Sequence, residues 1–211
     1  MKTHSPTTFT LKEVNHLPVY VDTYPDDGMF LRASKMKISF QSDAGYLNEE
    51  KSISRASTHA HISENIPISA LNGAVLTIAK IIKFVMSLEA EAELASLFVT
   101  TRKCFEIRRT LIQMGWPQHP TPMQVDNTTS VGLVTNKIMT KQTKSMDMRL
   151  WWLRYRTNQK QFRPHWVSGK GNYADYTSKN YSGQHQLGQR PLREGLTSTF
   201  NSNQAHCARL C

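Results

Sequence analysis

The sequence of 211 residues has few cysteines and no long hydrophobic run, and each absence excludes a class of protein. Three cysteines are too few for the disulfide framework of a secreted protein of this size. The most hydrophobic stretch, residues 74–86, contains two lysines and is shorter than the about 20 apolar residues that span a membrane. The first 20 residues lack the apolar core of a secretory signal. We therefore expect an intracellular protein, cytoplasmic or nuclear, that is not secreted and has no membrane partner.

Acidic residues are scarce in the second half of the chain. Residues 101–211 contain 17 Lys and Arg but only five Asp and Glu, whereas residues 1–100 contain 9 basic and 11 acidic residues. The formal net charge of +10 therefore comes entirely from the second half. Such a charge favours a polyanionic partner and ranks nucleic acid first, although charge alone does not separate nucleic acid from an anionic surface.

Two polar ends flank the part of the chain that can build a core. Residues 1–30 show no sustained hydrophobic period and are interpreted as a loosely held N-terminal arm. Residues 182–211 are rich in Gln, Ser, Asn, Gly and Arg, so we predict a polar, disordered tail. Residues 31–181 remain, and their number suits one domain.

Strand and helix patterns alternate within residues 31–181. Apolar and polar residues alternate with a period of two in residues 36–40, which predicts a strand. Further strand candidates cover residues 54–63, 74–79, 121–125 and 161–167, and the first of these is expected to be weak because it carries two His and three Ser. Helical spacing of apolar residues marks residues 87–114 and 143–159, and short helices are expected after Asp126 and over residues 172–179. This order predicts an α/β fold with a mixed sheet.

Four carboxylates stand where strands end or helices begin. Asp43 closes the first strand, Asp126 follows residues 121–125, Glu93 lies near the start of the long helix, and Asp175 lies in the last short helix. Side chains at such positions can converge on one crevice of an open sheet, where they would repel one another unless cations neutralised them. Mg²⁺ prefers such oxygen ligands. The same residues are also ordinary helix caps, turn formers and solvated charges, and the pattern alone leaves both interpretations open.

Five short motifs occur in a recognisable order. They are Ser-Asp-Ala at 42–44, Glu-Ala-Glu-Leu at 91–94, Val-Asp-Asn at 125–127, Lys-x-x-Asp-x-Arg at 144–149 and Asn-Tyr-Ala-Asp at 172–175. Together they resemble the ribonuclease H domain of copia-type LTR retrotransposon polyproteins over residues 22–181. The resemblance implies a ribonuclease H-like fold, which is a five-stranded mixed sheet flanked by helices. It also implies hydrolysis of the RNA strand of RNA–DNA hybrids with two Mg²⁺ ions, for which Mn²⁺ can substitute.

The resemblance assigns the same four carboxylates as metal ligands and catalytic residues: Asp43, Glu93, Asp126 and Asp175. Two ions about 3.5 to 4 Å apart can activate a water and stabilise the departing oxygen of a phosphodiester. We expect Asp43 to bridge the ions because it lies on the central strand. We expect Glu91 to point away as a surface charge.

The basic segment is the predicted nucleic-acid grip. Phosphate contacts are expected from Lys144, Arg149, Arg154, Arg156 and Lys170. The same segment carries four aromatic residues, of which we expect at least two in the core: Trp151, Trp152, Tyr155 and Trp166. The RNA–DNA hybrid is the expected partner, together with a reverse transcriptase domain supplied by another chain.

Several residues depart from the family pattern. Lys170 follows Gly169 where cellular relatives have a mobile His, residues 55–61 lack the usual Gly and aromatic residues, and Pro164 is compatible only with an edge strand. These departures keep an alternative open, a catalytically silent nucleic-acid-binding remnant of a retroelement. A third hypothesis is an integrase-type DNA strand-transfer domain, which needs only three carboxylates, so Asp175 counts against it.

Overall fold

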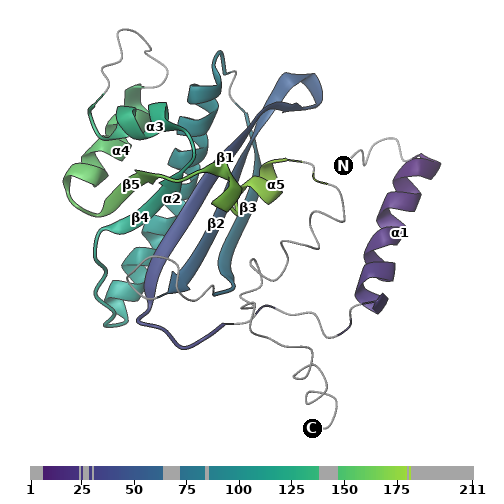
Figure 1. The fold of residues 1–211 in the computed structure, drawn as a ribbon, viewed down its shortest axis with the longest axis horizontal. Helices are drawn as coiled ribbons and strands as arrows, with labels where there is room; N and C mark the ends of the chain where they lie inside the picture. Colours follow the sequence, from purple (N-terminus) through teal and green to yellow (C-terminus); the bar gives the residue numbers. More distant parts are fainter. Residues whose placement is uncertain are drawn as a thin grey trace.

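A five-stranded mixed sheet forms the centre of the protein in a computed structural model, which describes residues 7–23, 25, 29, 31–63, 72–83, 86–137, 147–179 and 181 (Figure 1). The strands are β1 (Lys37–Glu49), β2 (Ile53–Ser63), β3 (Ala74–Ile82), β4 (Thr121–Val125) and β5 (Phe162–Trp166). Their order is β3-β2-β1-β4-β5. The pairs β1–β2 and β2–β3 are antiparallel, whereas β1–β4 and β4–β5 are parallel. The predicted mixed sheet is confirmed, and β1 is its central strand.

Helices cover both faces of this sheet (Figure 1). They are α2 (Glu89–Gln113), α3 (Thr128–Val134), α4 (Asp147–Asn158) and α5 (Asp175–Ser178), with short 3₁₀ turns η1 (Glu50–Ser52) and η2 (Gly169–Gly171). Alternate residues of β1 point to opposite faces. The Ser42 hydroxyl contacts Ser96 of α2, whereas the next side chain, Asp43, contacts Ser178 of α5. The helices α2 and α5 therefore lie against opposite faces of β1.

The hydrophobic core lies between the sheet and α2. Phe40 of β1 and Phe162 of β5 meet edge to face with ring centroids 5.8 Å apart, and both are almost fully buried. Leu94 and Leu97 of α2 pack into the same cluster. The helical spacing that predicts residues 87–114 therefore reflects a buried face on the sheet, and α2 keeps nearly those bounds.

Two sequence features that are unfavourable in a β-strand, a proline and a run of Ser and His residues, are present in a continuous sheet. Pro164 lies in β5, which pairs with β4 and forms the edge of the sheet among the described strands, as the sequence requires. The strand β2 is well formed between β1 and β3 despite its Ser and His residues. Its hydroxyl groups form hydrogen bonds to elements on both faces of the sheet. Thr58 hydrogen-bonds Thr100 of α2 at 2.5 Å, and the Ser57 hydroxyl donates to the Ala174 carbonyl directly before α5. The expected weakening of this strand is therefore not seen.

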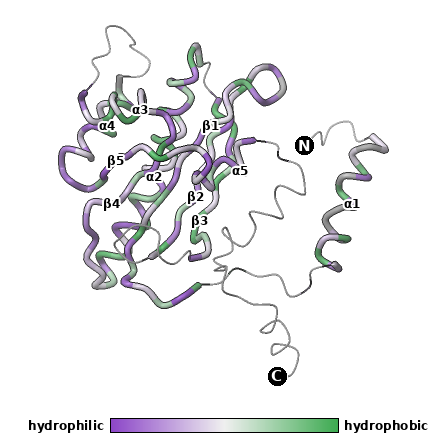
Figure 2. Tube along the Cα trace, viewed as in Figure 1, coloured by the Kyte–Doolittle hydropathy of each residue, from purple (hydrophilic) through white to green (hydrophobic). Residues whose placement is uncertain are grey.

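The N-terminal arm contains a helix that the sequence pattern does not predict. The helix α1 (Thr8–Thr23) includes Pro18 and lies apart from the sheet (Figure 1). Hydrophobic and hydrophilic positions are mixed along it, and Leu11, Val19 and Val21 are exposed (Figure 2). No regular apolar face marks it, which is why periodicity missed it. Among the described residues, no helix has the length and hydrophobicity that crossing a bilayer requires. The predicted tail, 182–211, lies outside the described residues.

Candidate metal centre

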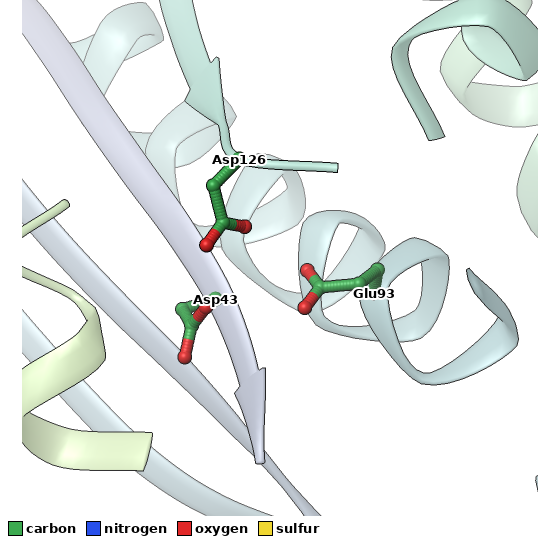
Figure 3. A group of neighbouring side chains, drawn as sticks. All are labelled: Asp43, Glu93 and Asp126. Atoms are coloured by element: carbon green, nitrogen blue, oxygen red, sulfur yellow. The ribbon is translucent and has the colours of Figure 1, made fainter. Parts of the chain in front are cut away.

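Three of the predicted carboxylates meet at one edge of the sheet. One oxygen from each of Asp43, Glu93 and Asp126 lies within 4.8 Å of the others (Figure 3). The parallel pairing of β1 with β4 brings Asp43 and the residue that follows β4, Asp126, to the same edge. The second turn of α2 supplies Glu93 from beside the sheet. Glu93 and Asp126 follow Asp43 by 50 and 83 positions in the chain, and all three thus share one cluster.

Asp43 is held from two sides. Its side chain is only 1% exposed, and one carboxylate oxygen accepts a hydrogen bond from the Ser178 hydroxyl of α5. Its backbone carbonyl accepts a hydrogen bond of 2.5 Å from the Ser96 hydroxyl of α2. Contacts from both neighbouring helices therefore fix the position and orientation of this carboxylate.

Glu93 leaves one buried oxygen without a protein partner. Its Oε1 accepts a hydrogen bond of 3.3 Å from the Ala44 backbone N–H. Its Oε2 is buried and has no hydrogen-bond partner among the described residues. A buried carboxylate oxygen without a partner is costly to the folded state, and such groups are common at sites that bind an ion. This oxygen is the observation that best fits a cation at the cluster.

Burial raises the pKa of all three carboxyl groups. Desolvation is the main cause in each, and it raises the pKa of Asp43 to about 7 against the opposing hydrogen bond from Ser178. The pKa of Glu93 lies well above its usual range, because the charges of Asp43 and Asp126 add to the desolvation. The pKa of Asp126 is also raised by burial. A divalent cation would favour the ionised carboxylates and so oppose this effect of burial.

Asp175 lies beside the three clustered carboxylates but is engaged elsewhere. Its side chain pairs with the ammonium group of Lys179 and accepts a hydrogen bond from the Tyr181 hydroxyl. Its charge still contributes to raising the pKa of Asp43, so the two groups are close. Ser178 connects them, because its hydroxyl contacts both the Asp43 carboxylate and the Asp175 carbonyl. Three of the four predicted ligands therefore meet, and the fourth stands next to them.

Glu91 corrects the expectation of a surface charge. It is only 9% exposed, and its Oε2 accepts a hydrogen bond of 2.7 Å from the Ser87 backbone N–H. The side chain turns back to the residues that precede α2 instead of pointing into solvent. The spacing of two residues between Glu91 and Glu93 on a helix predicts that Glu91 points into solvent. Sequence spacing does not show which free backbone N–H groups near the start of a helix a side chain can reach.

A buried amide network places the segment that leads to Asp175. The Gln41 side-chain amide donates to Gln124 at 3.0 Å and to the Gly171 carbonyl at 3.2 Å, and Gln124 donates to the same carbonyl at 3.1 Å. The Tyr173 backbone N–H donates to Gln41 at 2.6 Å. Both glutamines come from the strands that carry or precede the clustered aspartates. Sequence analysis did not identify them, because no local pattern distinguishes a buried glutamine pair from surface glutamines.

The residues predicted to contact nucleic acid differ in how far they are exposed to solvent. Arg154 is a correction, because it is only 5% exposed and its Nε donates to the Leu133 carbonyl at 2.7 Å, which joins α4 to α3. Arg156 is half-buried and its guanidinium lies 4.3 Å from the Phe105 ring centroid. Arg149 is half-exposed on α4, and Lys170 is exposed in η2. Lys144 lies outside the described residues.

Lys170 follows a glycine that approaches the candidate metal centre closely. A Cβ atom on Gly169 would lie 3.1 Å from an Asp126 carboxylate oxygen. The loop between β5 and α5 therefore passes directly beside Asp126. Lys170, the exposed residue that follows Gly169, is therefore one residue away from a direct neighbour of Asp126.

The aromatic residues of the basic segment are mostly exposed. Trp151, Tyr155 and Trp166 are 62%, 58% and 52% exposed, and only Trp152 packs against the core, next to Phe98. The expectation that at least two of the four belong to the core is wrong. The buried side of α4 is formed by Leu150 and Leu153, and Trp151 and Tyr155 lie on its solvent side.

The raised pKa of Asp43 predicts how Asp43→Asn changes the stability of the metal-free protein with pH. Folding raises the pKa of Asp43 from 3.8 to about 7, so between these pH values the carboxyl group is ionised in the unfolded protein and protonated in the folded protein. Raising the pH through this range therefore destabilises the wild type, whereas the variant has no carboxyl group here and is unaffected. The gain from Asp43→Asn should be small near pH 4 and grow to about 4 kcal/mol near pH 7, at about 1.4 kcal/mol per unit of pKa. Urea unfolding in a chelator from pH 4 to 8 measures it. The matched control is Glu106→Gln, an exposed carboxylate, and a gain independent of pH would contradict the prediction.

Comparison with known proteins identifies the fold. No family profile and no curated protein matches the chain. Ribonuclease H1 LC11, isolated from compost, superposes with a TM-score of 0.50 at 11% identity over 67% of this chain and 92% of its own. A structure of LC11 with an RNA/DNA hybrid gives 0.49 at 10% identity, over 65% and 91%. The N-terminal ribonuclease H domain of a Mycobacterium tuberculosis protein gives 0.47 at 14% identity, over 68% and 91%.

These likenesses concern the fold alone, because the sequence identities are low. Together with the sheet order and flanking helices, the match to the compost enzyme confirms the predicted ribonuclease H-like fold. The three carboxylates could hold a metal ion at the edge of that sheet.

Proposed function

We propose that this protein is a magnesium-dependent endonuclease that hydrolyses the RNA strand of RNA–DNA hybrids. The observation that carries the proposal is the cluster of Asp43, Glu93 and Asp126, whose oxygens lie within 4.8 Å of one another at the edge of the sheet. All donor atoms are carboxylate oxygens, which suit Mg²⁺ and also Mn²⁺. The buried, unpartnered Oε2 of Glu93 supports a cation as its missing partner.

The four carboxylates have distinct roles in this proposal. Asp43, Glu93 and Asp126 would hold one ion, and Asp175 together with Asp43 would hold a second. When bound, such a pair of divalent cations would supply the Lewis-acid chemistry that hydrolysis of a phosphodiester requires. The chain itself orients Asp43 through Ser178 and Ser96, so that this carboxylate faces both groups of ligands. Burial of the cluster strengthens each of these electrostatic interactions.

Substrate binding is assigned to the basic second half of the chain. The exposed Lys170 and the half-exposed Arg149 are the described side chains that we propose as phosphate contacts, with Lys144 as a third. Recognition of the RNA strand would depend on its 2′-hydroxyl groups. We further propose descent from a copia-type retrotransposon polyprotein and cooperation with a reverse transcriptase domain on another chain. The order of the five sequence motifs supports that descent.

One observation favours the catalytically silent, nucleic-acid-binding alternative. Asp175 is occupied by Lys179 and Tyr181, and a nuclease that uses two ions needs this carboxylate for the second ion. The silent protein would bind the hybrid through the same basic residues and leave it intact. The integrase-type hypothesis differs from both, because it requires activity on duplex DNA.

A cleavage assay tests the proposal. The full chain, incubated with Mg²⁺ and an RNA–DNA hybrid labelled on either strand, should cut only the RNA strand and leave 3′-hydroxyl and 5′-phosphate ends. A chelator should abolish the reaction, and duplex DNA should remain intact. Cleavage that persists in Asp43→Asn would reveal a contaminating nuclease. Binding of the hybrid without cleavage in either Mg²⁺ or Mn²⁺ would replace the proposal by the silent alternative.

A further inference from the structure

Lys179 places a positive charge next to the carboxylate cluster. Its ammonium group forms an ion pair with Asp175, four residues earlier in the chain. The Asp175 side chain of this pair is only 11% exposed, whereas that of Lys179 is 48% exposed. The Tyr181 hydroxyl donates to the other oxygen of the same carboxylate. Oδ1 of Asp175 and Oε2 of Glu93 are both buried and accept no hydrogen bond among the described residues, but Oδ1 of Asp175 differs because it is ion-paired with Lys179.

The charge of Lys179 acts on more than its own partner. It lowers the pKa of Asp43 and of Asp126 against the desolvation that raises both. In return, Asp175 and Asp43 raise the pKa of Lys179 although its burial opposes this. Lys179 is thus the lysine that neutralises part of the cluster charge in the metal-free protein.

We propose that Lys179 is a built-in counter-cation that competes with a divalent ion for Asp175. The inference deepens the proposed function, because it concerns the second ion of the same centre. An ion held by Asp43, Glu93 and Asp126 needs no displacement of Lys179, whereas an ion that uses Asp175 must first separate the Lys179–Asp175 pair. The protein would therefore bind two ions with clearly different affinities.

The surroundings of Asp175 support a displaceable contact. Lys179 directly follows α5, and nearly half of its side chain reaches solvent, so its ammonium group can leave without disturbing the core. The backbone beside it stays in place, because Ser178 hydrogen-bonds Asp43, and the Asn48 side chain donates to the Ser178 carbonyl. Movement of this one half-exposed side chain is sufficient to free Oδ1 of Asp175, while Tyr181 keeps its hydrogen bond to Oδ2, and this movement would control when the second ion binds.

A purely structural role for Lys179 predicts something different. An ion pair that only staples α5 would stabilise the protein without changing how strongly the second ion binds. A counter-cation, when removed, should lower metal-free stability and strengthen the second binding event at the same time. Metal binding, measured without substrate, separates the two roles.

The test is a calorimetric titration of the full chain with Mn²⁺ alone, for the wild type and three variants. Lys179→Met should strengthen binding of the second Mn²⁺ about tenfold, because a positive charge a few ångströms from a divalent ion is removed. Lys179→Arg should behave as the wild type. The matched control is Lys103→Met, which removes a lysine from an exposed ion pair on α2 and should also leave both binding steps unchanged.

The outcomes distinguish this inference from the proposed function. If Lys179→Met lowers thermal stability in a chelator but leaves the second Mn²⁺ affinity as in the wild type, Lys179 is a structural staple and the inference is wrong. If the second site strengthens although the hybrid is not cleaved, the inference stands and the nuclease proposal falls. If neither the wild type nor Lys179→Met binds any Mn²⁺, both the metal centre and the inference are wrong.

Discussion

Glu93→Gln is expected to make the metal-free protein more stable and to remove its cation-dependent activity. The glutamate carboxylate is 4% exposed, its Oε2 has no partner among the described residues, and burial raises its pKa. A neutral amide of the same shape removes the buried charge and can donate from its NH₂ group to a neighbouring carboxylate of the cluster. We expect a gain of about 1 to 2 kcal/mol at pH 7.5 in a chelator. Cleavage of the hybrid should fall at least about 1,000-fold, because a metal ligand is lost.

Two measurements and one control examine this expectation. Urea unfolding in a chelator gives the stability, and Mn²⁺ titration followed by the cleavage assay gives the function. The control is Glu91→Gln, which changes a second buried carboxylate of α2 that hydrogen-bonds Ser87 and lies outside the cluster. It should bind Mn²⁺ as the wild type does and should not gain stability. A Glu93→Gln protein that is destabilised and still binds Mn²⁺ normally would contradict the assignment of Glu93 as a ligand.

Gly45→Ala should impair both stability and activity, because α5 lies directly on this residue of β1. A Cβ atom at Gly45 would lie 2.5 Å from the Ser178 backbone carbonyl, a distance that real structures do not allow. Either α5 or β1 must move, at a cost of about 2 to 3 kcal/mol. The same movement would take the Ser178 hydroxyl away from Asp43. Cleavage should therefore fall as well, beyond any loss explained by unfolded protein.

Gly171→Ala is the matched control for Gly45→Ala. Its added Cβ would meet only Val167 at an ordinary 3.8 Å, so stability and cleavage should stay near the wild-type values. Thermal unfolding and the cleavage rate of the folded fraction measure both variants. Wild-type stability and activity in Gly45→Ala would mean that α5 does not press on β1 in solution, and would also remove the support for the Ser178–Asp43 contact.

The sequence predicts the sheet well because its signals are local. Period-two alternation in residues 36–40 and helical spacing in residues 87–114 each reflect one buried face, and β1 and α2 appear where these patterns lie. Asp126 follows β4 as predicted, whereas the prediction that Asp43 closes its strand is wrong, because β1 continues to Glu49 and Asp43 lies in its middle, paired with Ser57 of β2. Periodicity fails where burial is irregular, as in α1, which has no continuous apolar face, whereas α4 lies within the predicted range 143–159.

The roles of individual polar side chains are less predictable. Arg154 is indistinguishable in sequence from a surface arginine, yet its guanidinium joins α4 to the Leu133 carbonyl. Ser178 has no signal that marks it as a partner of Asp43, which lies 135 positions away. Such contacts depend on which groups face each other after the helices pack, and one-dimensional spacing carries little of that information.

The sequence by itself indicates the strands of the sheet and most of its flanking helices, favours a polyanion as partner, and marks the acidic residues near predicted strands and helix starts as candidates for one site. These properties follow from local hydrophobic period and from composition. Only the tertiary structure decides that Asp43, Glu93 and Asp126 meet while Asp175 is paired with Lys179. The reason is physical: the parallel pairing of β1 with β4 and the opposite placement of α2 and α5 determine which charges share a buried volume, and the energies of buried charges depend on distances that the chain acquires only by folding.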